Sequence, residues 1–553
     1  MYNETDSMYE EIEQLTKQMV AIPSVNSSPH GEKDIADFLY ETLRAFPYFQ
    51  KHPEYLFSQP LKDDALERKN IFALLRGEKG SSPDTLIFHG HIDTVGVEDY
   101  GTLKPYAFDC DALLEQMLEL DLSDEIRRDL ESGDYMVGRG ACDMKSGGAV
   151  FIIVLKYLSE HPGEIDGNIL LSLNPVEENQ HTGIIDGLDF LLRLKEQYGL
   201  NYYMAINNDY ICPLYPSDPH HYIYTGAVGK LLPCFYIYGK ETHVGQCFEG
   251  FDASRAAAEL VRLISLNPAS CDGYHDEYTL PPSVLQMRDL KDFYNVQTAQ
   301  SAYVYFNYFV HNKSMDVIIE ELKAYAKQAL ENVLAEHNAR YRDFCRLSHI
   351  DYAPYDYPLQ VVTYDELYRS VAETYDGDLN AVLAQIASLE LKKGTDKREI
   401  ALRLTETLVR LSDKKDPVIV LFFAAPYCPH NTLKSELPEE QKIYCELEEI
   451  LNSFDGDHTQ NYEILQFFPS LSDSSYLKID DSEESLSLLL SNFPQFDLLY
   501  PVPVKKIKAL NIPAVNYGVY GKDAHKWSER VNKSYSFGVL PKLILETVKY
   551  YFQ

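Results

Sequence analysis

A histidine and an aspartate two residues apart follow an apolar run near residue 88. Leu86 to Phe88 has the pattern of a short buried strand and leads directly into His89-Gly90-His91-Ile92-Asp93. In an open α/β sheet, residues just past the carboxyl end of a strand line the ligand crevice. The Asp93 carboxylate can accept the proton of one ring nitrogen of His91 and leave the other nitrogen free for a cation. Alone, such a tripeptide is more often a turn with a satisfied histidine, because a metal ion needs further ligands.

Other acidic residues follow predicted strands or tight turns in the same way. Asp143 lies in a glycine-rich turn that opens an apolar helix, and the spacing of this turn fits neither a P-loop nor a dinucleotide-binding turn. Glu177 and Glu178 follow one predicted buried strand, and Asp209 follows the next. Taken singly, Asp143 is explained as a helix cap and the glutamates as a solvated loop. These acidic residues would share a function only if the fold brings them together in one place.

A second histidine near the C-terminus completes a set of metal-binding residue types. It follows the last predicted strand, which begins at Ala514. We expect these side chains to meet at one edge of the sheet, and the set is His91, Asp143, Glu178, Asp209 and His525. Two imidazoles and three carboxylates suit two divalent cations, zinc most naturally, with one carboxylate bridging them. Glu177 would then be free to take a proton from water.

Five motifs resemble those of a known enzyme family in order and approximate spacing. They are Gly90-His91-Ile92-Asp93, Gly138-Arg139-Gly140-Ala141-x-Asp143-Met144-Lys145, Glu177-Glu178, Gly239-Lys240-x-x-His243 and His525-x-x-x-Glu529. Over nearly the whole chain they resemble the cocatalytic dizinc aminoacylase, carboxypeptidase and dipeptidase family, which includes acetylornithine deacetylase and succinyl-diaminopimelate desuccinylase. The run from Phe467 to Asp473 and the large insertions resemble a long branch linked to arginine utilization in Gram-positive bacteria.

The resemblance implies two metal sites and a general base. His91 and Asp209 would hold one zinc, Glu178 and His525 would hold the other, and Asp143 would bridge them, with cobalt or manganese as alternative metals. Asp93 would orient His91, and Glu177 would be the general base and acid.

The predicted elements indicate an α/β fold with an inserted domain. A mixed-sheet catalytic domain of the zinc-exopeptidase type is expected over residues 1–222 and 346–553. Between them, residues 223–345 have the order β-β-α-β-β-α, which makes a two-layer α+β unit. In the family this inserted domain is a lid and a dimer surface. His243 would polarise the scissile carbonyl, often from the neighbouring subunit, and Asn295 would bind substrate.

The sequence departs from the family pattern at three places. Val176 stands where an aspartate precedes the two glutamates, Asn307-Tyr308-Phe309 replaces an Asp-x-Arg, and no proline follows Asn295. The usual clamp for a substrate carboxylate is therefore not predicted here, and the sequence supports metal binding better than any substrate.

Composition limits the expected partners and location. The 553 residues carry a formal charge of −35, which disfavours nucleic acid and anionic membrane surfaces and allows a small-molecule substrate. The nine cysteines form no Cys-x-x-Cys pair, and the sequence shows neither a signal-peptide pattern nor an apolar segment long enough to cross a bilayer. We therefore expect a cytoplasmic protein that forms a homodimer through the inserted domain.

These observations favour a zinc-dependent hydrolase of an amide or peptide bond. Its substrate would be an N-acyl amino acid or a dipeptide, in the catabolism of arginine or other amino acids. The alternative is a non-catalytic metal-binding relative that serves as a regulator or assembly partner in arginine utilization. Glu177 favours the enzyme, since a binding protein needs no base beside its metals. A serine hydrolase using Ser472 and Asp473 would lack the usual Gly-x-Ser-x-Gly turn.

Overall fold

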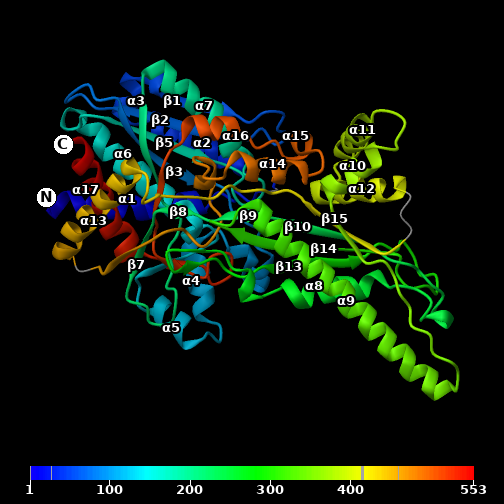
Figure 1. The fold of residues 1–553 in the computed structure, drawn as a ribbon. Coiled ribbons are helices and arrows are strands. Elements are labelled where there is room, and N and C mark those ends of the chain that lie inside the picture. The colour runs from blue at the N-terminus through cyan, green and yellow to red at the C-terminus, as the bar shows by residue number, and fades with distance from the viewer. Residues whose placement is uncertain (1, 27, 413–415, 459) are drawn as a thin grey trace. The chain divides into compact units, whose positions relative to one another are not determined.

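The protein divides into two compact units, each with its own sheet and hydrophobic core (Figure 1). The computed structural model describes residues 2–26, 28–412, 416–458 and 460–553. Unit 1 comprises Met1–Ala227, Asn431–Ile479 and Pro503–Gln553, and unit 2 comprises Val228–His430 and Asp480–Val502.

Unit 1 is built on an eight-stranded mixed sheet with the order β1-β2-β5-β3-β6-β19-β7-β18. The central strands β5, β3, β6 and β19 run parallel to one another, and the antiparallel partners β2 and β7 flank them. The strand bounds are β1 Leu56–Pro60, β2 Lys69–Arg76, β3 Asp84–His91, β5 Asn168–Asn174, β6 Asn201–Asn207, β7 His221–Tyr224, β18 Tyr462–Leu465 and β19 Ala514–Tyr517. The expected mixed α/β sheet is confirmed.

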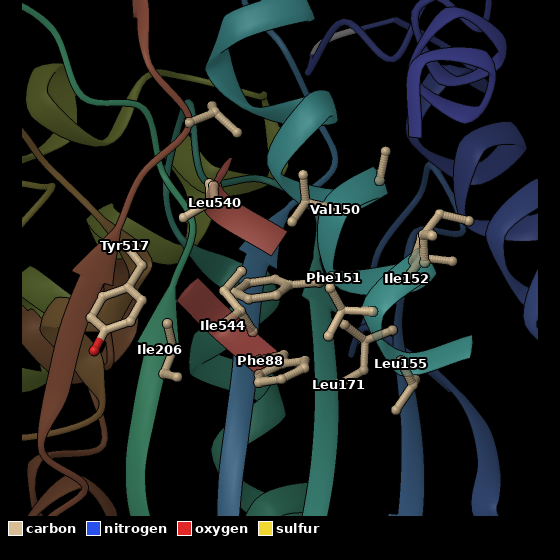
Figure 2. Packing of buried hydrophobic residues seen from close by; sticks show 14 of the residues in the cluster. Phe88, Val150, Phe151, Ile152, Leu155, Leu171, Ile206, Tyr517, Leu540 and Ile544 are labelled. Atoms are coloured by element: carbon tan, nitrogen blue, oxygen red, sulfur yellow. The ribbon is translucent and has the colours of Figure 1, made fainter. Parts of the chain in front are cut away.

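Helices cover both faces of this sheet, as its apolar parallel strands require. On one face the Phe88 ring of β3 stacks on Phe151 of α6 (Ser146–Glu160) with 4.6 Å between centroids, and α17 (Leu540–Phe552) adds Ile544 to the same core (Figure 2). On the other face Phe72 of β2 stacks on Phe190 of α7 (Thr182–Tyr198) at 4.7 Å. Helix α6 is apolar almost all round, which explains its complete burial near its N-terminus.

The remaining elements of unit 1 surround this sheet. Helix α1 (Tyr2–Val20) packs against α6 through Ile12 and Met19, in agreement with the helical spacing of its sequence. The segment between β3 and β4 forms a small core of its own around Leu113. The other helices are α2 Gly31–Arg44, α3 Pro47–Lys51, α4 Cys110–Leu118, α5 Asp124–Glu131, α13 Pro438–His458 and α16 Val504–Leu510, and the short strands are β4 Tyr135–Val137, β8 Gly226–Ala227, β17 Asn431–Thr432, β20 Gly521–Lys522 and β21 Arg530–Asn532.

Unit 2 contains a second sheet with the order β13-β14-β10-β16-β15, and β9 also pairs with β14. From β9 to α9 the elements follow the expected order of two strands, a helix, two strands and a helix, with a small hairpin between α8 and β13. The strands are β9 Gly229–Leu231, β10 Pro233–Tyr238, β11 Gly273–Tyr274, β12 Glu277–Tyr278, β13 Ser283–Asp289, β14 Ser301–Val310, β15 Gln360–Thr363 and β16 Val418–Phe423, and the helices are α8 Ala253–Ile264, α9 Met315–Ser348, α10 Tyr364–Ala372, α11 Leu379–Lys392, α12 Lys397–Leu411, α14 Glu483–Ser491 and α15 Phe496–Leu499.

The second domain boundary differs from the sequence-based expectation. The sequence predicts that residues 346–430 belong to the catalytic domain, but they lie in unit 2 together with residues 480–502. The physical reason is β16, which is buried along its whole length and therefore needs a partner on each edge. It finds β10 on one side and β15 on the other, and α11 and α12 cover it in one apolar cluster. The chain thus re-enters unit 1 at Asn431 instead of residue 346.

Among the described helices, none is both long and apolar enough to cross a bilayer. Helix α9, with 34 residues, exceeds the required length, but it alternates a buried stripe around Leu322 and Leu330 with charged residues such as Glu331.

Candidate metal centre

Parallel strand ends in unit 1 bring the predicted residues to one edge of the sheet. Strand β3 lies between β5 and β6 and is parallel to both. His91 is the last residue of β3, Glu177 and Glu178 follow β5, and Asp209 follows β6. His91, Glu177 and Asp209 are buried. Because all three strands end at the same side, these side chains enter one small region, as the sequence predicts.

Asp143 lies between the two predicted histidines. Its Oδ1 is 3.0 Å from His91 Nε2, and its Oδ2 is 3.1 Å from His525 Nε2. His525 Nε2 is also 2.8 Å from Glu178 Oε1. Each carboxylate oxygen of Asp143 thus faces a different imidazole, which is the arrangement required of a bridging ligand between two cations.

Among the described residues, four groups of side chains have the spacing of metal ligands, and two of these groups together contain all five predicted ligands. One group is His91, Asp143 and Asp209, and the other is Asp143, Glu178 and His525; in each, the ligand atoms lie within 4.8 Å of one another. Asp143 belongs to both groups. The described residues therefore contain donors for two ions, in the pairing that the sequence resemblance implies.

The electrostatics of this cluster require positive charge. Burial and the charge of Asp143 raise the pKa of Asp209 to about 8 and also raise the pKa of Glu178. Burial would raise the pKa of Asp143 as well, but hydrogen bonds to His525 and His91 lower it. Burial alone would lower the pKa of His525, and its bonds to Asp143 and Glu178 raise it to about 11. Divalent cations would let all these carboxylates ionise together, so the donor set fits such ions.

Asp93 holds the loop that carries the two glutamates. Its Oδ1 accepts the backbone N–H of Glu177 and its Oδ2 accepts that of Glu178, both at 3.1 Å. His91 Nδ1 lies 3.2 Å from the main-chain oxygen of Asp93 and 3.6 Å from its Oδ1. The Asp93 carboxylate therefore bonds to the backbone of the two glutamates, and its predicted role in orienting His91 stays a prediction.

The same loop contains a backbone conformation that is rare for its residue type. Val176 is buried and has a φ of 71°, in the left-handed region that β-branched residues avoid. A hydrogen bond of 2.8 Å from His181 N–H to the Val176 carbonyl closes the turn. The tertiary contacts of this loop must therefore hold Glu177 and Glu178 against local strain.

A buried ion pair supports the backbone around Asp143. Glu529 Oε1 accepts the N–H of Cys142 at 3.0 Å and that of Asp143 at 3.2 Å, while its Oε2 accepts Arg139 Nη1 at 2.7 Å. Gly147 allows the turn to pack closely against Asn208, because a Cβ at this position would lie 2.2 Å from the Asn208 carbonyl oxygen. The turn can thus approach the loop that carries the next ligand, Asp209.

The chain is similar to known proteins over most of its length. The model of peptidase family M20/M25/M40 matches residues 87–388. Protein RocB of Bacillus subtilis is 37% identical over 548 residues, covering 98% of this chain and 95% of RocB. The chain belongs to the M20/M25/M40 peptidase family. The uncharacterized protein YqjN of the same organism is 32% identical over 98% of this chain and 96% of its own length.

A solved M20 structure shows the same fold. The M20 family metallo-carboxypeptidase Sso-CP2 from Sulfolobus solfataricus superposes with a TM-score of 0.52 at 11% identity, covering 98% of this chain and 99% of that one. Membership in the M20/M25/M40 family places the chain among the hydrolases of the metallopeptidase class.

Two residues that the sequence analysis connected with the substrate lie in unit 2. His243 is exposed, and its Nδ1 accepts the N–H of Gly245 at 3.0 Å. Asn295 is half-buried and donates through Nδ2 to Gln297 Oε1 at 2.7 Å. The metal-ligand groups belong entirely to unit 1. The roles of His243 and Asn295 therefore stay predictions.

Sequence reasoning missed several residues that position the ligands. Arg139 and Glu529 stand inside the quoted motifs, but no role was assigned to them. Asn516 of β19 was not singled out, although its Oδ1 accepts the Asp209 N–H and its Nδ2 donates to the Asp209 carbonyl, both at 3.1 Å. The signal for Glu529 was its place four residues after His525. Asn516 gave no signal, because its partner is distant in the sequence.

We predict that the protein re-equilibrated with zinc holds about two ions per chain, since Asp143 faces two ligand groups. His91→Ala and His525→Ala should each lower this content, because each removes a ligand of one group. Native mass spectrometry measures the stoichiometry, with His243→Ala as a matched control outside the ligand groups. Full metal content in both ligand variants would contradict this assignment.

We predict that Glu529→Gln weakens zinc binding roughly 10–100-fold, as loss of a group that orients a ligand typically does. The glutamine keeps an acceptor for the Asp143 backbone but loses the charge that pairs with Arg139. Competition with a chelating dye measures the affinity. Glu546→Gln, at a half-exposed ion pair on α17, serves as the control. Equal affinities in Glu529→Gln and Glu546→Gln would show that the Arg139 pair does not support the metal ligands.

Proposed function

We propose that this protein is a dinuclear zinc hydrolase that cleaves an amide or peptide bond in a small amino-acid derivative, either an N-acyl amino acid or a dipeptide. Its setting would be the catabolism of arginine or other amino acids, which rests on the sequence resemblance described above. Cobalt or manganese in place of zinc would serve the same donor set.

The position of Glu177 carries this proposal. It is buried beside Glu178, and its carboxylate comes within 4.8 Å of ligand atoms of His91 and Glu178. It belongs to neither of the two groups that share Asp143. Burial raises its pKa well above the ordinary value of a glutamate, so it readily takes up a proton. A carboxylate with these properties suits a general base better than a third structural ligand.

The residues define the proton path of the proposed reaction. Two bound cations would polarise the scissile carbonyl and lower the pKa of the attacking water. Glu177 takes a proton from that water and later gives it to the leaving amine, which balances the hydrolysis. His243, as a donor to the developing oxyanion, would complete the site, and Asn295 would bind the substrate.

The alternative reading of Ser472 as a nucleophile has no support among the described residues. Its Oγ accepts from Asn207 Nδ2 and from Ser474 Oγ, both at 2.9 Å. A serine nucleophile requires a general base on its hydroxyl, whereas the Ser472 hydroxyl contacts an amide and a second serine, and the nearby His181 imidazole bonds to Asp473.

We predict that Glu177→Gln lowers kcat by roughly 10²–10⁴-fold, because an amide cannot accept the proton of the attacking water. Zinc content should remain unchanged, since the ligand groups are complete without Glu177. The measurement is hydrolysis of a panel of N-acyl amino acids and dipeptides by zinc-loaded protein. Glu436→Gln, at an exposed position of unit 1, is the control for the substitution itself.

The same experiment distinguishes the alternative, a non-catalytic metal-binding relative that acts as a regulator or assembly partner. Zinc-loaded wild-type protein that hydrolyses no member of the panel would favour that alternative. Hydrolysis that Glu177→Gln leaves intact would instead refute the proposed mechanism.

A homodimer formed through unit 2 is part of this proposal. β13 is an edge strand of the sheet, and its Leu285 and Met287 side chains are about half exposed. The loop that follows exposes Phe293 and Tyr294 by 73% and 85%. An unpaired strand edge beside exposed apolar side chains favours pairing with a second copy of the chain. His243 would then act in the active site of the partner.

We predict that Met287→Lys shifts the protein toward the monomer, because it places a charge on the proposed interface. Light scattering after gel filtration measures the mass, with Leu389→Lys on α11 as an equally exposed control.

Mixing Glu177→Gln with His243→Ala tests the shared site, since the mixed dimer has one intact set of both residues. Failure to regain activity in a mixture that does exchange subunits would contradict the role of His243 across the dimer.

A further inference from the structure

The buried imidazole of His181 and the buried carboxylate of Asp473 lie close to Glu177. Neither residue belongs to the two groups that share Asp143. His181 Nδ1 is 2.9 Å from Asp473 Oδ1 and 4.0 Å from Glu177 Oε1. His181 and Asp473 are 1% and 2% exposed. They are separated by 292 positions in the chain, so only the fold brings them together.

The geometry gives the His181 ring one defined orientation. Asp473 accepts from Nδ1, which fixes the proton on that nitrogen. The ring of Tyr476 packs against the imidazole with 5.2 Å between centroids. The His181 backbone donates to the Val176 carbonyl at 2.8 Å, at the start of the loop that carries Glu177. The ring is therefore held both through its side chain and through its backbone.

Two residues flank Glu177: Asp93 contacts its backbone, and His181 lies near its carboxylate. On one side its N–H is bonded to Asp93 Oδ1, which positions the backbone. On the other side the Nδ1 edge of His181 faces its Oε1, at a distance too long for a hydrogen bond but close enough to orient a carboxylate electrostatically. The left-handed conformation of Val176 shows that this loop does not hold its shape by local preference.

The second carboxylate oxygen of Asp473, Oδ2, is buried and accepts no hydrogen bond from the described residues. A buried carboxylate is costly unless it is paired, and His181 is its pairing imidazole. An isolated carboxylate at this place would not be explained by packing, since an apolar residue would fill the same space at lower cost.

We propose that the His181–Asp473 pair positions Glu177 for proton transfer, with Asp473 acting through His181. This proposal rests on the proposed hydrolase function. His181 presents a fixed, polarised N–H edge to the Glu177 carboxylate and limits its rotation, so that the other oxygen points toward the attacking water. Both are positioning residues, because neither contacts the reacting atoms.

The test compares Asp473→Asn and His181→Gln with the wild type in zinc-loaded protein. We expect kcat to fall roughly 10–100-fold in each variant, while KM and zinc content remain unchanged, as for loss of a supporting group. Asp473→Glu, which keeps the charge, should recover part of the lost kcat.

A second histidine–aspartate pair, with a buried Asp218 and a partly exposed His220, supplies the control. His220 Nδ1 is 3.0 Å from Asp218 Oδ1 in the same unit, and Asp218 is buried but contacts no ligand group. Asp218→Asn should therefore leave kcat unchanged, even if it lowers the melting temperature. An equal loss of kcat in Asp218→Asn and Asp473→Asn would reduce the effect to general destabilisation and overturn the proposal.

Crystal structures of the zinc-loaded wild type and Asp473→Asn provide a readout that does not depend on turnover. A single Glu177 conformer in the wild type and an altered or multiple one in the variant would support the proposal, even if no substrate is found and the hydrolase function fails. The same Glu177 conformer in both would overturn it. A third zinc ion bound by Glu177, His181 and Asp473, whose ligand atoms lie within 4.8 Å, would overturn it as well.

Discussion

The repulsion among carboxylates crowded at one sheet edge is the constraint on which the rest of unit 1 depends. Asp143, Glu178 and Asp209 supply donors to two adjoining groups, and Glu177 lies beside them. In a buried environment such a set does not remain ionised without positive charge between its members. Asp143 meets this condition partly through the two imidazoles on its two oxygens. The carboxylates that remain without a positive partner give this edge a donor set that fits divalent cations.

Holding these side chains in place requires contacts from distant parts of the chain. The Glu529 carboxylate supports the backbone of Asp143 across 386 positions, and Asp93 supports the backbone of Glu177 across 84. Val176 and His525 both adopt left-handed backbone conformations, which local preferences disfavour. Each supporting carboxylate is buried, and each is satisfied by backbone N–H groups or by arginine. These contacts fix the backbone that carries the candidate ligands, as preorganised chemistry requires.

Unit 2 differs in character from unit 1. Its sheet combines strands from the expected insertion with β15 and β16, which come from the following hundred or so residues, and helices α11 and α12 cover these later strands. The result is a larger second unit than the family resemblance implies, and the three departures at Val176, Asn307-Tyr308-Phe309 and the residue after Asn295 occur in a chain with this enlarged unit.

The sequence by itself determined which residue types are available and where each lies relative to a strand end. The mixed α/β sheet was predictable, and so was the meeting of His91, Asp143, Glu178, Asp209 and His525 at one edge, because parallel strands bring their carboxyl ends together and each motif directly follows a strand or a turn. The boundary at Asn431 was not predictable, since an apolar strand such as β16 fits either sheet until its partners are known. Only the tertiary structure assigned partners to Asp93, Glu529, Asn516 and the His181–Asp473 pair. These contacts join residues tens to hundreds of positions apart, and no local pattern encodes a hydrogen bond whose geometry depends on how the whole chain packs.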